Sequence, residues 1–231
     1  MKRLGLIGGM SWESTLTYYR LLNQGVQARL GGFHSADLLM HSVDFQRIES
    51  MQRSGEWNEA GALLAASGLG LQSAGAQALL LCTNTMHKVA RDIEAAVTVP
   101  LLHIADATGK GVQRAGHSRI GLLGTRFTME EAFYRQRLTD GFGLDVLTPD
   151  ANARTDIDHI IFAELCRGNI RESSRETCRT VIANLVDRGA EAIVLGCTEI
   201  GLLVGEKDSA VPLFDTVELH VEAALTWMFN P

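Results

Sequence analysis

Two short stretches of this 231-residue chain carry residues that can do proton-transfer chemistry. One is LLLCTNTMH at residues 79–87, and the other is IVLGCTEI at residues 193–200. Each is an apolar run that ends in small polar side chains: Thr83, Asn84 and Thr85 in the first, and Cys197, Thr198 and Glu199 in the second. Thiol, hydroxyl and carboxyl groups are among those that enzymes use as nucleophiles, acids and bases.

Both stretches have the pattern of a buried parallel strand, which is apolar on both faces. Their polar tips should therefore lie at the carboxyl ends of strands, where open α/β sheets bind ligands. The two stretches also align with each other, because Ala192 stands 114 residues after Ala78. The same offset places Cys197 opposite Thr83, so the repeat can present two reactive groups to one cleft.

Two equivalent polar tips suit a symmetric reaction on a small substrate, of which racemisation or epimerisation is the plainest example. One group removes a proton from a carbon atom, and a group on the opposite face returns one. Cys197 suits this role, because a thiol has a pKa of about 8.5 that falls beside a positive charge or a helix N-terminus. The alternative is that Cys197 is a small, buried core residue. The sequence shows no sign of a pyridoxal cofactor.

Composition argues against several classes of function. Hydrophobic residues make up 46% of the chain, and the net charge of -6 without a basic cluster argues against nucleic acid as a partner. The longest apolar runs are far shorter than the roughly 18 residues of a membrane span, and the N-terminus lacks a signal-peptide cleavage site. The four cysteines have neither disulfide-framework nor zinc-site spacing. We expect a cytoplasmic protein with free thiols and no metal.

Further repeats indicate that the whole chain is duplicated. Besides the polar tips, three segments of the first half recur in the second: Arg3–Gly8 as Arg119–Gly124, Tyr18–Arg20 as Phe133–Arg135, and Val99–Leu101 as Val211–Leu213. We therefore predict an α/β fold of two similar Rossmann-like or flavodoxin-like subdomains related by pseudo-two-fold symmetry. We place the first subdomain at residues 1–103 plus 208–231 and the second at residues 104–207.

Within each half, strands and helices should alternate. Strands are predicted near residues 3–8, 37–43, 79–83, 99–103, 119–124, 144–147 and 193–197. Helices are predicted near residues 11–29, 59–74, 86–96, 105–115, 156–166, 173–188 and 216–229, with a loop and a helix at 44–57. Ser11 is the expected N-cap of the first helix, and Glu13 favours its first turn.

The sequence resembles the aspartate/glutamate racemases, which work without pyridoxal phosphate. The resemblance runs over nearly the whole chain and is carried by the opening Leu6–Met10, by Asn84-Thr85 with His87, and by the box Gly196–Glu199. The Gly-Cys-Thr-Glu form of this box points to the aspartate/glutamate racemase branch, because bacterial cell-wall glutamate racemases usually carry His after Cys-Thr.

This resemblance implies two α/β subdomains with the active site in the cleft between them, a C-terminal helix that returns to the first subdomain, and a homodimer. It also implies an isomerase that needs no cofactor and uses Cys197 as one acid/base on an amino-acid substrate. Family precedent puts the backbone around Met10 near the substrate. Gln52, with Arg47, lies where the family reads the substrate side chain.

The remaining polar residues of the two tips each have two interpretations. Asn84, Thr85 and Thr198 can cap the helices that follow, or they can hold the substrate carboxylate at a helix N-terminus, and the same atoms can do both. Glu199 is either a solvated acid in a first helical turn or, if buried near Cys197, a group that orients the thiol or the substrate ammonium.

The first motif departs from the family pattern. The family has Cys-Asn-Thr, whereas here Thr83 takes the position of the first catalytic cysteine and Cys82 stands one residue early. Side chains of a strand alternate between faces, so Cys82 should point away from the site. A hydroxyl is a far weaker acid than a thiol and needs a base or a water relay, for which His87 is the nearest candidate. We predict that Cys197 and Thr83 are the catalytic pair.

Two further functions stay open. A related enzyme of the superfamily, such as a maleate isomerase, a hydantoin racemase or a decarboxylase, shares the fold and needs a cysteine. An amino-acid-binding protein without turnover would also fit a chain that lacks the first cysteine. The family's second basic reader of the substrate side chain has no clear equivalent in Glu164–Arg167, so the resemblance does not fix which amino acid is the substrate.

Overall fold

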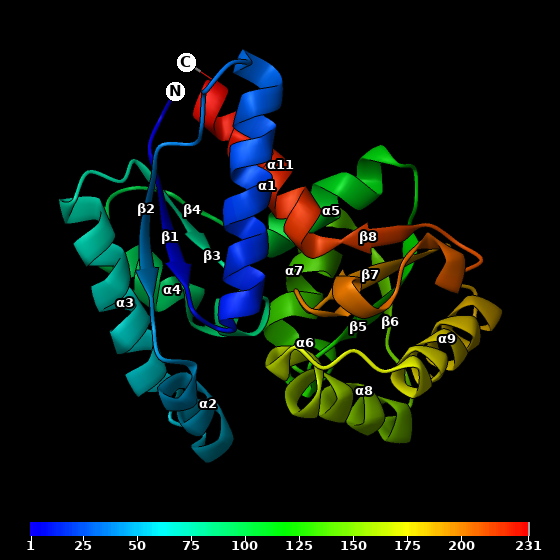
Figure 1. The fold of residues 1–231 in the computed structure, drawn as a ribbon. Coiled ribbons are helices and arrows are strands. Elements are labelled where there is room, and N and C mark those ends of the chain that lie inside the picture. Colours follow the sequence, from blue (N-terminus) through cyan, green and yellow to red (C-terminus); the bar gives the residue numbers. More distant parts are fainter. Residues whose placement is uncertain (231) are drawn as a thin grey trace. The chain divides into compact units, whose positions relative to one another are not determined.

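The computed structural model of the protein describes residues 1–230 and has the predicted α/β fold. Within these residues the strands form two four-stranded parallel sheets, ordered β2-β1-β3-β4 and β6-β5-β7-β8 (Figure 1). The strands are β1 (Leu4–Gly8), β2 (Leu38–Ser42), β3 (Ala78–Leu81), β4 (Leu101–Leu102), β5 (Arg119–Gly124), β6 (Asp145–Leu147), β7 (Ala192–Gly196) and β8 (Leu213–Asp215). Equivalent strands have the same order in both sheets, as a duplicated chain requires.

Helices follow the strands in each sheet. The α-helices are α1 (Trp12–Leu30), α2 (Phe45–Ser54), α3 (Trp57–Ser73), α4 (Ala90–Ala96), α5 (Ile104–Arg114), α6 (Arg126–Glu130), α7 (Ala132–Phe142), α8 (Ala151–Ala163), α9 (Glu172–Asp187), α10 (Ile200–Leu203) and α11 (Thr216–Phe229). The 3₁₀ helices are η1 (Thr85–Val89), η2 (Leu165–Arg167) and η3 (Glu206–Asp208).

The helices differ from the prediction in three places. The helix expected at residue 86 begins as η1 and becomes α-helical only in α4. Helix α8 begins at Ala151 rather than near residue 156, because the Asp150 carboxylate accepts a hydrogen bond from the Ala153 N–H at 2.9 Å and caps the helix there. Helices α6 and α7 occupy a stretch for which the sequence pattern predicts no helix.

The chain forms two compact units, one of residues 1–103 with the segment from His220 onwards, and the other of Ile104–Leu219. Strand β8 pairs with β7 in the second sheet, through Ile193 opposite Leu213. Residues 208–219 therefore belong to the second unit, whereas the predicted boundary at residue 208 assigns them to the first. The chain returns to the first unit only within α11.

Helices cover both faces of each sheet. In the first unit, α1 and α11 lie on one side and α3 and α4 on the other; in the second unit, α5 and α7 lie opposite α8 and α9 (Figure 1). The strands β1, β3 and β7 are buried along their whole length, as parallel strands covered on both faces should be. The apolar runs before both polar tips are therefore interior strands.

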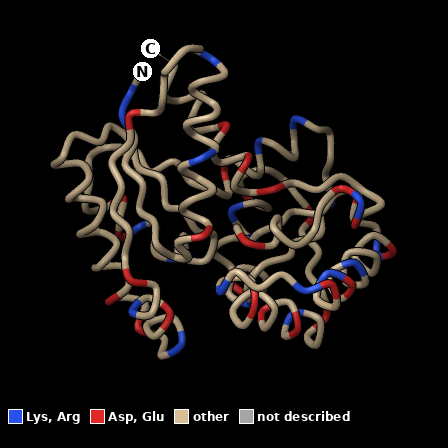
Figure 2. Tube along the Cα trace, in the orientation of Figure 1, with Lys and Arg blue, Asp and Glu red and all other residues tan. Residues whose placement is uncertain are grey.

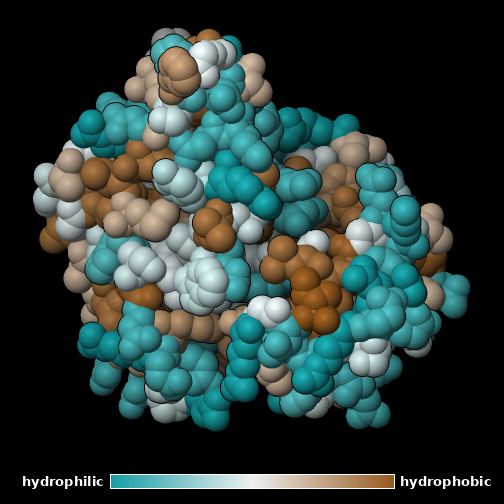
Figure 3. Space-filling view, in the orientation of Figure 1, coloured by the Kyte–Doolittle hydropathy of each residue, from teal (hydrophilic) through white to brown (hydrophobic). Residues whose placement is uncertain are grey.

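The outer faces of α2 and α9 are polar, whereas α1 exposes Trp12, Leu16 and Tyr19. In Figure 3 the visible surfaces of α2 and α9 are largely hydrophilic, while Ile48 and Met51 on the inner face of α2 are buried. This division gives α2 one face for the core and one for water. Among the described residues, we find no helix with both the length and the apolar character that crossing a bilayer requires.

Two buried tyrosines mark equivalent positions of the duplicated halves. Tyr18 on α1 and Tyr134 on α7 are both fully buried. The Tyr18 Oη lies 2.8 Å from Nδ1 of His220, and the Tyr134 Oη lies 3.4 Å from Oγ1 of Thr108. His220 and Thr108 stand 112 residues apart, which is also the offset of the nearby Val-Pro-Leu segments. Tyr18 thus corresponds to Tyr134, and the predicted alignment of Tyr18 with Phe133 is wrong by one residue.

Candidate active site

The first polar tip begins where strand β3 ends. The Thr83 N–H donates to the Leu81 carbonyl at 2.9 Å, so the chain turns directly after the strand. Thr83, Asn84 and Thr85 are all buried. The side chain of Asn84 makes no capping hydrogen bond to η1, so the capping interpretation of Asn84 does not hold.

A cluster of buried histidines lies beneath this tip. The Nδ1 of His87 donates to the Thr83 carbonyl at 2.7 Å, and the His87 ring lies 4.4 Å from the His103 ring and 6.0 Å from the His220 ring, centroid to centroid. His87 therefore holds the backbone of Thr83 through Nδ1, rather than its hydroxyl. This contact gives His87 a positioning role that the sequence leaves undecided.

The neighbouring cysteine does not resemble an active thiol. Cys82 is fully buried, and its carbonyl accepts a hydrogen bond from the Ser14 hydroxyl of α1 at 3.0 Å. Burial raises the pKa of the Cys82 thiol far above its ordinary value, since the charged form would lose its hydration. At neutral pH Cys82 is a protonated core residue.

Met10 and Gln52 come together with the first tip in the same unit. Met10 follows β1, which pairs with β3, and it packs in one buried cluster with Met86 of η1. The amide Nε2 of Gln52 donates to the Met86 Sδ at 2.9 Å. The other amide atom of Gln52, Oε1, is buried and has no hydrogen-bond partner within residues 1–230. A buried polar atom in this state is costly, so Gln52 has an acceptor to offer a ligand. Arg47, by contrast, is exposed on α2.

The second polar tip centres on one carboxylate. The Oε2 of Glu199 accepts hydrogen bonds from the Cys197 Sγ at 3.2 Å and from the Thr198 Oγ1 at 2.6 Å. All three residues are buried, with Glu199 only 3% exposed. Glu199 is therefore not a solvated acid, and the Thr198 hydroxyl is directed to Glu199 rather than to a helix end.

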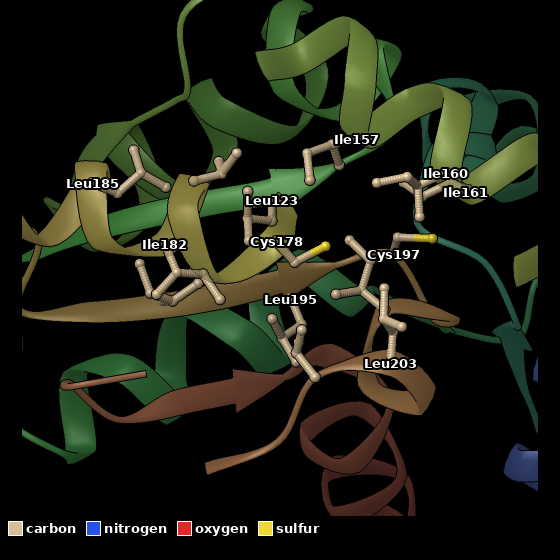
Figure 4. Close-up of a cluster of buried hydrophobic side chains, with 14 of the residues drawn as sticks. Leu123, Ile157, Ile160, Ile161, Cys178, Ile182, Leu185, Leu195, Cys197 and Leu203 are labelled. Carbon is tan, nitrogen blue, oxygen red and sulfur yellow. The ribbon is translucent and has the colours of Figure 1, made fainter. Parts of the chain in front are cut away.

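The surroundings of Cys197 determine its protonation state. The residue lies in an apolar cluster that includes Ile161 and Leu203 (Figure 4). Burial is the main cause that raises the pKa of the Cys197 thiol well above its ordinary value, and the negative charge of Glu199 adds to it. At neutral pH Cys197 is therefore a protonated thiol.

Cys166 is a neighbour of this tip that the sequence does not reveal. It lies on η2, packs against the apolar cluster of Cys197, and its thiol interacts with the Glu199 carboxylate. Burial, followed by the charge of Glu199, raises the pKa of Cys166 as well. Two protonated thiols therefore share one carboxylate. No short-range sequence pattern joins residue 166 to residue 199, so no signal could have found this contact.

Asp215 is a further, partly buried acid at the carboxyl edge of the second sheet. It ends β8, and its Oδ1 accepts hydrogen bonds from the N–H groups of Val217 at 2.7 Å and Glu218 at 3.4 Å. The carboxylate also lies against Gly201 of α10, where an added Cβ would collide with it. Burial raises the pKa of Asp215 to about 6.

Among residues 1–230 no group of three or more His, Cys, Asp or Glu side chains could hold a metal ion.

Residues 7–224 match the model of the family described as Asp/Glu/Hydantoin racemase. The fold is similar to a crystal structure of a candidate Asp/Glu racemase from Yersinia pestis, with 53% identity over 100% of both chains and a TM-score of 0.93. An aspartate racemase homologue from Pyrococcus horikoshii OT3 is 31% identical, again over 100% of both chains, with a TM-score of 0.85.

One relative is named for its activity. The broad specificity amino-acid racemase RacX of Bacillus subtilis is 25% identical over 146 residues. This match covers 63% of the present chain and 62% of RacX. The present chain thus spans less than two thirds of that relative's length.

The raised pKa of Asp215 predicts a pH dependence of stability. An Asp has a pKa of about 3.9 when unfolded, so the folded state is penalised above pH 6, where Asp215 must be charged, and the penalty fades as the pH falls toward 4. Asp215→Asn keeps the capping oxygen without the charge. We expect it to be more stable than the wild type at pH 8 by about 1–3 kcal/mol, with the difference shrinking toward pH 4. Urea unfolding at several pH values measures this; a difference that does not change with pH would contradict it.

Proposed function

The chain belongs to the Asp/Glu/hydantoin racemase family, and we propose that it is an amino-acid racemase that works without pyridoxal phosphate on aspartate, glutamate or a broader set of amino acids. The proposed catalytic groups are Cys197 and Thr83, acting on opposite faces of the α-carbon. The observation that carries this proposal is the buried hydrogen bond from the Cys197 thiol to the Glu199 carboxylate at the end of β7.

A buried carboxylate is costly unless it is hydrogen-bonded, and here its partners include a thiol. A thiol partner stabilises a buried carboxylate only weakly, but it can take part in proton transfer. The Glu199 carboxylate accepts from the thiol at 3.2 Å, so it is placed to take the thiol's proton. An arriving α-ammonium group would favour this step, because a nearby positive charge lowers the pKa of a thiol.

The reaction then needs two proton transfers at one carbon. The Cys197 thiolate takes the α-proton, and the negative charge left behind spreads into the substrate carboxylate. A proton reaches the other face from the Thr83 hydroxyl, directly or through water. Water replaces the proton that Thr83 gives, and Glu199 releases to water the proton it took. No atom is oxidised or reduced, so the cycle needs no co-reactant.

Binding groups are available on both tips. We propose that Gln52 Oε1 accepts a hydrogen bond from the substrate and that Asn84, Thr85 and the backbone N–H of Thr198, whose hydroxyl donates to Glu199, hold its α-carboxylate, with the backbone at Met10 close to it. The unpartnered Oε1 of Gln52 supports the first assignment. The family resemblance supports the others, and it alone supports a homodimer.

A second candidate function has one observation in its favour. The buried Cys82 leaves Cys197 as the thiol at a strand tip that interacts with a carboxylate, and a related decarboxylase-like enzyme of the superfamily would need only one such cysteine. Release of carbon dioxide from a substituted malonate, without racemisation of any amino acid, would favour that enzyme.

The unequal pair predicts unequal exchange of the two α-protons with solvent. The two enantiomers are equal in free energy, so kcat/KM for racemisation must be the same in both directions. A hydroxyl is a much weaker acid than a thiol, so the α-proton that faces Cys197 should exchange for deuterium in unreacted substrate at least about tenfold faster than the α-proton that faces Thr83. Thr83→Cys should raise the slow exchange and the shared kcat/KM by at least about tenfold, since threonine and cysteine are similar in size. NMR of pure L- and D-glutamate and aspartate in D2O measures this, and equal exchange from both enantiomers, unchanged in Thr83→Cys, would exclude the unequal pair.

Glu199 should set the pH at which Cys197 becomes active. Its negative charge raises the pKa of Cys197, so Glu199→Gln should move the ascending limb of kcat/KM to lower pH by about one unit. Its maximal kcat should fall, because the thiol loses its proton acceptor. Glu206→Gln, at an exposed acid of η3, is the matched control and should change neither. If the limb stays in place or moves to higher pH in Glu199→Gln, the assigned role of Glu199 is wrong.

A further inference from the structure

A polar pocket separate from the two polar tips lies entirely within the second unit, at the carboxyl ends of β5 and β6. It has a volume of about 430 Å³ and is lined by residues of α6, α7, α8 and the segment after β6: Arg126, Met129, Glu130, Arg135, Thr148, Ala151, Arg154 and Thr155. None of these residues belongs to the two polar tips. The volume is in the range of pockets that bind small molecules.

The pocket has more positive than negative charge. Arg126, Arg135 and Arg154 bring three guanidinium groups, and Glu130 is the one carboxylate among the lining residues. Glu130 is fully engaged by two of them, because Arg126 donates to its two oxygens at 3.2 and 3.3 Å and Arg154 donates to Oε1 at 3.0 Å. These arginines, Arg126 first, lower the pKa of Glu130, so it is charged at neutral pH. Among the lining residues the positive charges exceed the negative ones, and the Asp158 carboxylate, which accepts from the Arg126 backbone N–H at 2.8 Å, offsets part of that excess.

Arg135 is the lining residue with an unsatisfied guanidinium N–H group. Its Nε is buried and has no hydrogen-bond partner in the part of the chain that the structure describes. This differs from α9 in the same unit, where basic and acidic residues alternate (Figure 2) and Arg175 and Arg179 pair with acids at 3.0 and 2.6 Å. A buried guanidinium N–H without an acceptor is costly, and the Arg135 side chain is one of those that line the pocket.

We propose that this pocket is a binding site for a small dianion, with Arg135 as its main ligand and Arg126 and Arg154 as secondary ones. Guanidinium groups present paired N–H donors that match the oxygens of phosphate and carboxylate groups. A dianion would offset the excess positive charge of the lining residues and give the guanidinium group of Arg135 an anionic partner. The shared chemistry is two negative charges carried on oxygens, as in a phosphate monoester or a dicarboxylate.

The test uses hydrogen phosphate and succinate as probes on the full-length protein at pH 8, by calorimetry and by melting temperature, with sodium chloride at matched ionic strength as the blank. We expect saturable binding of at least one dianion with a dissociation constant of about 1 mM or tighter, and a matching rise in melting temperature. Stronger binding of phosphate would identify a phosphate ligand, and stronger binding of succinate a dicarboxylate.

Arg135→Gln should weaken that binding by at least about tenfold, while Arg20→Gln, at an exposed arginine of α1, should leave it unchanged. Arg135→Lys serves if the glutamine variant does not fold, because it keeps the charge and loses the Nε donor; it should weaken binding by at least about threefold. The proposal is overturned if neither dianion binds saturably to the wild type, or if the folded Arg135 variants bind as tightly as it does.

Discussion

The hydrogen bonds that meet at the buried Glu199 carboxylate organise the second polar tip. A charge placed among apolar side chains must be hydrogen-bonded, and Glu199 satisfies this need with the hydroxyl of Thr198 at 2.6 Å and the thiol of Cys197 at 3.2 Å. The same charge raises the pKa of Cys197 in addition to the effect of burial. The site therefore rests with its thiol protonated and next to a proton acceptor, a state that the positive charge of the proposed amino-acid substrate would reverse.

The strands of the second sheet explain how the Glu199 carboxylate comes to lie in a buried position. β7 is buried along its whole length. It pairs with β5 up to Gly124 opposite Gly196, and a Cβ added to Gly124 would lie 2.6 Å from the Gly196 carbonyl oxygen. The strand thus delivers Cys197 from the interior of the sheet, with apolar residues of α8 and α9 around it. β3 delivers Thr83 in the same way in the first unit, where His87 holds its carbonyl.

Much of the fold follows from patterns along the chain, because buried strands are apolar throughout and the duplication shows as repeated segments. The two tips, too, are visible as apolar runs that stop at polar residues. What the sequence does not show depends on distant residues: the burial of Glu199, the approach of Cys166 and the bond from His87 to Thr83 all require packed helices. The boundary near residue 208 fails for a related reason, since a three-residue edge strand, β8, joins the second sheet by pairing alone.

The central claim is that Cys197 moves the α-proton, and hydrogen exchange at the α-carbon tests it without depending on net racemisation. L-Glutamate and L-aspartate are incubated in D2O with the wild type and with Cys197→Ser, and the α-proton signal is followed by NMR. The account predicts that the wild type introduces deuterium at the α-carbon of at least one of the two and that Cys197→Ser, while still folded, does so at least about 100-fold more slowly. Exchange at the wild-type rate in Cys197→Ser would contradict it.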